Sequence, residues 1–118
     1  MCELDEVAVG EEPDVLCAQT EVDLLDEDSA TALAETFKVL SDPTRVRIIS
    51  ALSHGYLCVH QLAQSLGLTQ SAVSHQLATL RDMRLVTFVK DGRHVYYALD
   101  DEHIADLFQQ GLAHIRHS

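Results

Sequence analysis

The chain has 118 residues, which is room for one domain and not two, because an independent core usually needs on the order of 100 residues. Hydrophobic residues make up 47% and charged residues 23%, so the chain can bury a core, while no stretch approaches the roughly 18 uninterrupted apolar residues of a membrane helix. The net charge of −11 would disfavour nucleic acid as a partner if it were spread evenly, because phosphate attracts positive surface.

The acidic residues are concentrated near the N-terminus. Residues 1–28 hold 11 of the 19 acidic residues and no lysine or arginine, which leaves 8 acidic residues to balance all 8 basic ones over 29–118. Four basic residues and two acidic ones lie in 71–96. We therefore expect a mobile acidic arm over 1–28, and its charge need not prevent a folded domain over 29–118 from binding DNA.

Two helices are expected at the start of the folded domain. Ser29 can cap the first, whose apolar residues recur at i, i+4 and i+7 along one helical face. Asp42 is a natural N-cap for the second, with Pro43 at a position where its missing N–H costs nothing, and Gly55 ends that helix. The apolar faces are Leu33, Phe37 and Leu40 in the first helix, and Val46, Ile49 and Leu52 in the second.

The next segments predict a helix-turn-helix. A short helix spans about 59–66 and ends at Gly67, and Thr69 caps a fourth helix that runs to about Met83. A short glycine turn of this kind places two helices at a steep angle. The buried face of the fourth helix is expected to be Val73, Leu77 and Leu80.

Two β-rich runs follow, over 85–89 and 94–99. Between them, Asp91 and Gly92 are expected at the two central turn positions, which both need positive φ in the favoured hairpin. Asp100 and Asp101 can cap a final amphipathic helix. The predicted fold class is mostly α with a β-hairpin wing, in the element order of a winged helix-turn-helix.

The fourth helix and the hairpin carry residues suited to DNA. The helix face opposite its apolar stripe is short, polar and nearly free of charge, which permits close approach to base edges, and its N-terminal end can meet a phosphate or a base. The hairpin tip gathers basic side chains. The alternative is a solvated helix face. The candidate DNA-binding residues are Gln70, Ser71, Ser74, His75 and Gln76 on the helix and Lys90, Arg93 and His94 on the wing.

The final helix carries four residues of metal-ligating type, Asp101, His103, His114 and His117. His103 and His114 are separated by about 16.5 Å along a helix axis, so one helix cannot bring both to an ion with Zn–N near ~2.1 Å. An antiparallel copy would bring Asp101 and His103 of one subunit against His114 and His117 of the other. Three imidazoles and one carboxylate suit tetrahedral Zn(II), with Co(II) and Ni(II) as weaker fits. The alternative is that the histidines are solvated and complement the helix dipole.

A second candidate metal site combines Cys58 and His60 with Cys17, and with Cys2, from the acidic arm. Thiolates favour softer ions, so Cd(II), Pb(II) or tightly held zinc would suit this site. The alternative is that Cys58 is a small core residue and His60 a surface one.

The run Ser71-Ala-Val-Ser-His-Gln-Leu-Ala-Thr-Leu-Arg81, followed by Leu85-Val86 and Gly92-Arg93-His-Val-Tyr-Tyr97, resembles the ArsR/SmtB family of bacterial metal-responsive repressors. The resemblance covers roughly residues 30–117. It implies a homodimeric winged helix-turn-helix whose first and last helices build the dimer interface. It also implies binding to an imperfect inverted repeat of operator DNA and release when a metal binds.

The resemblance also bears on the two metal sites. The pattern Asp-x-His-x(10)-His-x-x-His is similar to the zinc-site spacing of family members that sense metal through the C-terminal helix. In this chain, the resemblance implies that a backbone carbonyl near Arg84 accepts a hydrogen bond from His114. Family members with the thiolate site often show Cys-x-Cys where this chain has Cys58-Val59-His60. An efflux pump or a metallothionein is the implied regulated gene product.

These observations favour a cytoplasmic, zinc-responsive repressor that binds DNA in the apo form. Three cysteines, an odd number, with no secretory signal favour reduced thiols. One rival function keeps the DNA interface and makes Cys17 and Cys58 a thiol-redox switch. An enzyme is not expected, because four protein ligands leave zinc no open position and no catalytic motif is present. A zinc buffer would leave the polar helix face and the basic wing unexplained.

Overall fold

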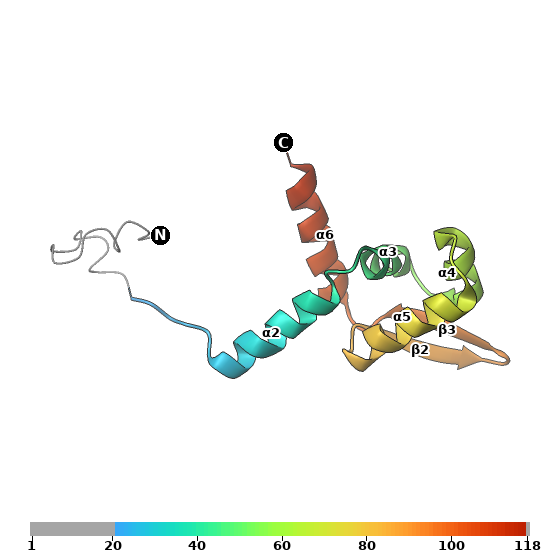
Figure 1. Cartoon of the computed structure of the whole chain (residues 1–118), viewed down its shortest axis with the longest axis horizontal. Helices are drawn as coiled ribbons and strands as arrows, with labels where there is room; N and C mark the ends of the chain where they lie inside the picture. Colours follow the sequence, from blue (N-terminus) through green and yellow to red (C-terminus); the bar gives the residue numbers. More distant parts are fainter. Residues whose placement is uncertain (1–20, 118) are drawn as a thin grey trace.

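The computed structural model describes residues 21–117. Helices dominate this part of the chain, and a small sheet projects from one end of the body (Figure 1). The elements, labelled as in Figure 1, are α2 (Glu27–Val39), α3 (Pro43–Leu52), β1 (Leu57–Cys58), α4 (Val59–Leu66), α5 (Gln70–Asp82), β2 (Val86–Asp91), β3 (His94–Leu99) and α6 (Glu102–Arg116). This order confirms the predicted winged helix-turn-helix. None of these helices is long and apolar enough to cross a membrane.

The sheet has three antiparallel strands in the order β1-β3-β2. The hairpin of β2 and β3 was predicted, but β1 was not, because two residues are too short to show an alternating pattern. Leu57 and Phe88 both pair with Tyr97, so β3 lies in the middle. Cys58 is therefore both the end of a strand and the N-cap of α4.

The hairpin turn differs by one residue from the prediction. Asp91 pairs with His94, so the two loop residues are Gly92 and Arg93. Gly92 has a φ of 64°, whereas Asp91 and Arg93 do not have positive φ. A two-residue turn with glycine in its first central position needs positive φ only there. The expected central pair, Asp91 and Gly92, was wrong because the strand extends through Asp91.

The boundaries of α2 and α3 also correct the sequence-based expectation. Asp26, not Ser29, is the N-cap of α2, and its carboxylate accepts a hydrogen bond from the Ser29 N–H at 3.0 Å. That bond lowers the pKa of Asp26. Either residue can cap a helix, but two further acidic residues in the first turn favour the earlier start through the helix dipole. Helix α3 ends at Leu52 with Ser53 as its C-cap, before Gly55.

The core lies between α3, α4, α5 and the sheet. Its largest fully buried side chains are Ile48, Leu62, Val73, Leu77, Leu80 and Val86. Helix α2 contributes no buried residue, and α6 contributes only Ile104. Figure 1 shows α2 and α6 extending from the body at the end opposite the hairpin tip. The two terminal helices thus contribute little to the core.

Helix α5 ends in a Schellman motif with a strained residue. The Leu85 N–H donates to the Leu80 carbonyl and the Arg84 N–H to the Arg81 carbonyl, both at 2.9 Å. Arg84 has a φ of 58° and is the one non-glycine residue with positive φ in the described chain. Glycine usually occupies this position, because a Cβ strains the left-handed conformation.

Glycine substitutions at two nearby arginines should therefore change stability in opposite directions. Arg84→Gly should raise the free energy of unfolding by about 0.5–1 kcal/mol, because relief of left-handed strain exceeds the entropy that glycine adds to the unfolded chain. Arg81→Gly should lower it by about 1 kcal/mol, because position 81 is helical. Urea unfolding at equal protein concentration measures both. A destabilised Arg84→Gly would show that the arginine side chain does more than occupy the cap.

Candidate DNA interface and metal ligands

The turn between α4 and α5 is built by local backbone chemistry. Gly67 ends α4 with a left-handed φ of 69°, and Thr69 caps α5 by accepting a hydrogen bond from the Ala72 N–H at 3.0 Å. The Leu68 N–H donates a hydrogen bond to the Ala63 carbonyl at 3.0 Å. These bonds occupy polar groups that the two helix ends would otherwise leave free, and they fix where α5 begins.

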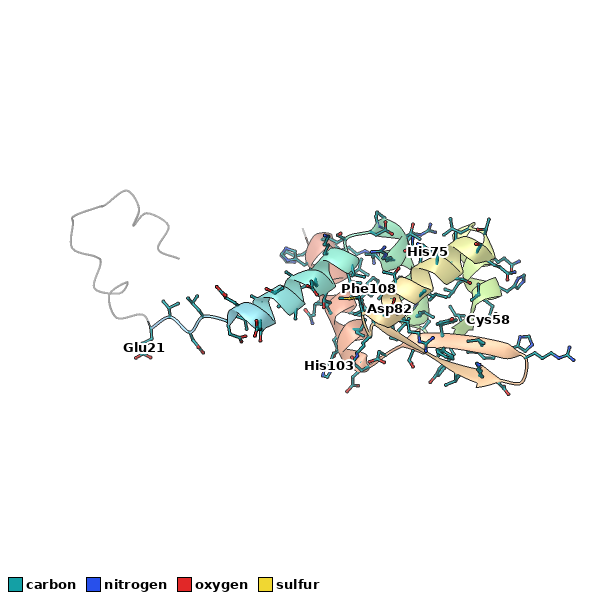
Figure 2. The ribbon with its side chains drawn as sticks, turned by 60° about the horizontal axis from the view of Figure 1, so that its bottom comes forward. Glu21, Cys58, His75, Asp82, His103 and Phe108 are labelled. Atoms are coloured by element: carbon teal, nitrogen blue, oxygen red, sulfur yellow. The ribbon has the colours of Figure 1, made fainter. Side chains whose placement is uncertain are left out.

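One face of α5 is buried and the opposite face is exposed, as predicted. Val73, Leu77 and Leu80 are completely buried, whereas Ser71, Ser74, His75 and Gln70 are exposed. In Figure 2, His75 lies on the outer side of α5. The exposed face presents hydroxyl, imidazole and amide groups, which can donate to or accept from base edges.

Two glutamines of the candidate set are held by other side chains. The Gln76 Oε1 atom accepts a hydrogen bond from Arg45 Nε at 2.8 Å, and Gln76 is half-buried. Gln70 Nε2 lies 3.2 Å from His60 Nδ1, which joins the first residue of α5 to α4. These contacts restrict the directions in which both amides can reach. The role of Arg45 could not be found from sequence, because its partner is 31 residues away.

The hairpin carries exposed basic side chains. Lys90, Arg93 and His94 are all exposed at or beside the turn. Over the described residues, the one carboxylate within 4.0 Å of a basic or imidazole nitrogen is that of Asp101, beside His103. The charges of Lys90 and Arg93 are therefore available to an anionic partner.

Asp101 and His103 lie together at the start of α6. Asp101 is the N-cap, as predicted, and its Oδ1 atom accepts hydrogen bonds from the backbone N–H groups of His103 at 2.8 Å and Ile104 at 3.3 Å. The same oxygen is 3.5 Å from His103 Nδ1. The His103 side chain is 88% exposed and that of Asp101 is 49% exposed. Both can reach a group outside the chain.

His114 and His117 lie at the other end of α6, and both are exposed. The helix ends at Arg116, and His117 is an extended C-cap residue with φ −71° and ψ 128°. Within residues 21–117, no three histidine, cysteine, aspartate or glutamate side chains lie close enough to hold a metal ion.

Cys58 and His60 lie at the start of α4. Cys58 is half-buried and is the one cysteine in the part of the chain that the structure describes. Its backbone N–H donates to Gln61 Oε1 at 2.9 Å. The other two predicted ligands, Cys17 and Cys2, lie outside the described residues. Figure 2 shows Cys58 and His103 on different sides of the body, so one chain does not bring these two candidate ligands together.

An apolar groove runs between α2, α3 and α6. It has a volume of about 340 Å³ and its lining residues are all apolar or glycine. The exposed fraction is 50% for Phe37 and 76% for Ile115. The groove includes Phe37, Val46, Ile49, Ile104, Leu107 and Phe108. We call this surface, formed by α2 and α6 around the groove, the apolar end.

Comparison with known proteins finds one recurring kind of relative. The family model "Bacterial regulatory protein, arsR family" matches residues 42–87. A "Transcriptional repressor SmtB homolog" from Synechocystis sp. is 38% identical over 99% of this chain and 91% of its own length. The "HTH-type transcriptional regulator NmtR" of Mycobacterium tuberculosis is 41% identical over 79% of this chain and 78% of its own.

Solved structures of similar fold include proteins of the same kind. The solution structure of apo-NmtR has a TM-score of 0.71 at 38% identity, covering 85% of this chain and 84% of that one. A homodimeric winged helix-turn-helix DNA-binding domain from Mycobacterium bovis has a TM-score of 0.69 at 25% identity, covering 83% of this chain and 94% of that one.

Two substitutions at Asp101 should separate its capping role from its charge. Asp101→Ala should lower the free energy of unfolding by about 1 kcal/mol, because it removes the N-cap acceptor of α6. Asp101→Asn should remain close to the parent, because asparagine is an equally good N-cap. Urea unfolding in buffer with a chelator measures both. Equal losses for the two variants would contradict the capping assignment.

Proposed function

The chain belongs to the ArsR/SmtB family of metal-responsive transcriptional repressors, and from this premise we propose that it binds operator DNA as a homodimer and releases the DNA when Zn(II) binds. The protein is a transcriptional regulator and not an enzyme. The observation that carries the proposal is the separation of two surfaces. The exposed face of α5 and the basic hairpin lie on the body, and the ligand-bearing helix α6 belongs to the apolar end.

A second copy of the chain is the proposed occupant of the apolar end. A 13-residue helix with no fully buried residue is marginal in water, and α2 leaves Leu33 and Phe37 about half exposed in the single chain. Two copies related by a two-fold axis would cover these side chains and those of α6. The same axis would present two copies of α5 to an inverted repeat of double-stranded DNA, about 34 Å apart.

Zinc would be held by residues from both copies of α6. Asp101 and His103 at the start of one helix would meet His114 and His117 at the end of the antiparallel partner helix. The exposure of all four residues fits this role, and three imidazole nitrogens with one carboxylate oxygen suit tetrahedral zinc. Bound zinc would supply a cross-link between the subunits. The Cys58 and His60 pair offers softer donors, for which Cd(II) or Pb(II) are the candidate ions, while Co(II) fits the α6 site less well than zinc.

A backbone hydrogen bond offers a route from α6 to α5. The Asp100 N–H donates to the Leu85 carbonyl at 3.0 Å. Asp100 precedes the proposed ligand Asp101, and Leu85 belongs to the motif that ends α5. A change in the direction of Asp101 would therefore act on the end of α5. Metal can weaken DNA binding only by its different affinity for the two arrangements, and DNA must weaken metal binding by the same factor.

Loss of the α6 ligands should abolish the metal response without loss of DNA binding. For His103→Ala and Asp101→Asn, we expect the metal-free protein to retard its own upstream promoter DNA as the parent does. Added Zn(II) should release DNA from the parent but not from the variants, because each lacks one proposed ligand per site. Gel shifts with Zn(II), Cd(II) and chelator measure this. Cys58→Ser is the matched control, and its failure to respond to zinc would place control at the thiolate site instead.

The basic wing should contribute through phosphate contacts. Arg93→Ala should weaken binding across DNA sequences and reduce the dependence of log K on log salt by about 1, because one phosphate contact releases about one counterion. Fluorescence anisotropy at several salt concentrations measures the slope. Lys38→Ala is the matched control, because Lys38 is an exposed base on α2, away from the hairpin. An unchanged slope in Arg93→Ala would exclude this wing contact.

A further inference from the structure

Arg45 joins three helices through hydrogen bonds. It lies in the first turn of α3, where its backbone N–H donates to the capping carboxylate of Asp42 at 3.1 Å. Its side chain donates from Nε to Gln76 Oε1 on α5 at 2.8 Å and from Nη1 to the Val39 carbonyl of α2 at 3.1 Å. Arg45 is half-buried. One guanidinium group thus bonds the last residue of α2 to the middle of α5.

The Val39 carbonyl needs a donor from outside the backbone. Val39 is the last residue of α2, and the residue four positions later is Pro43, which has no N–H to donate. Arg45 supplies the missing hydrogen bond and places a positive charge at the negative end of the helix dipole. The proline that starts α3 therefore creates the acceptor that Arg45 uses.

Gln76 connects the same guanidinium group to α5 through a hydrogen bond. It lies between His75, on the exposed face, and Leu77, which is completely buried. Hydrogen bonds to a charged donor are stronger than neutral ones, and the planar guanidinium fixes the direction of both bonds. A lysine at this position would present a single nitrogen and could not reproduce the fork.

We propose that Arg45 is a positioning residue that sets the orientation of α5 relative to α2, and so the distance between the two copies of α5 in the dimer. This inference rests on the proposed function, since it needs a dimer built on α2 that binds an inverted repeat. Arg45 acts here through Gln76 and not by touching DNA. Helix α2 has no fully buried residue, and at its C-terminal end only the partly buried Val39 and Leu40 pack against the core. The hydrogen bond from Arg45 therefore adds a directional constraint to this limited apolar contact.

The test compares operators that differ only in half-site spacing. Duplex DNA selected by the parent protein from a random pool supplies the reference inverted repeat, and two further duplexes carry one base pair more or less between the half-sites. We expect the parent to lose about tenfold or more in affinity on the altered duplexes, since a rigid dimer reads one spacing. Arg45→Ala should reduce this loss to about threefold or less, as should Gln76→Leu.

Two controls identify the cause. Arg47→Ala removes an exposed arginine from the same helix and should keep the spacing preference of the parent. In the double variant Arg45→Ala, Gln76→Leu, the second change should have no further effect on the ratio, because the two residues act as one unit.

Several results would overturn the inference. An unchanged spacing ratio in Arg45→Ala or in Gln76→Leu would show that the bond does not set the geometry. A salt dependence reduced by about one in Arg45→Ala would show a direct phosphate contact instead. If Arg45→Ala does not fold by circular dichroism, Gln76→Leu alone decides. Failure of the parent to retain any duplex would refute the proposed function itself, which is a separate outcome.

Discussion

The core of this chain is too small to cover all of its helices. Apart from Ile104 of α6, the buried side chains come from α3, α4, α5 and the sheet, and the two terminal helices are left with apolar faces in solvent. The cost of exposed apolar surface is roughly 25 cal/mol per Å², so these faces favour association. The proposed dimer, the shared metal site and the spacing of the two α5 helices all depend on this property.

The length of α6 adds a second constraint. With 15 residues it spans about 22 Å, so the pair at its start and the pair at its end cannot meet within one chain. A site that uses all four residues has to be formed by two chains. In this arrangement a metal ion would act on the interface between subunits, which is the place from which the position of both α5 helices can be changed together.

The sequence predicted the elements whose ends carry strong local signals. The helix before Gly67 and the helix after Thr69 have bounds close to those expected, because a left-handed glycine and a hydroxyl cap leave few alternatives. Where two signals compete within three residues, as with Asp26 and Ser29, local reasoning chose the wrong one. Strand β1 and the bond from Arg45 to Gln76 escaped prediction because both depend on residues far away in the sequence. The four metal ligands and the DNA-binding residues stay predictions, although all of them except the half-buried Gln76 are exposed, as those roles require.

The exposure of helix α2 affects how fast the protein would be degraded in a cell. Because none of its residues is buried within the chain, its order is tied to protomer abundance by mass action. A protomer without a partner would offer an easily opened helix to proteases, whose cleavage follows the population of open forms. Degradation would then be fastest at low protein concentration and would slow as dimers form. The degradation rate and the extent of repression would therefore both be set by the concentration of dimer.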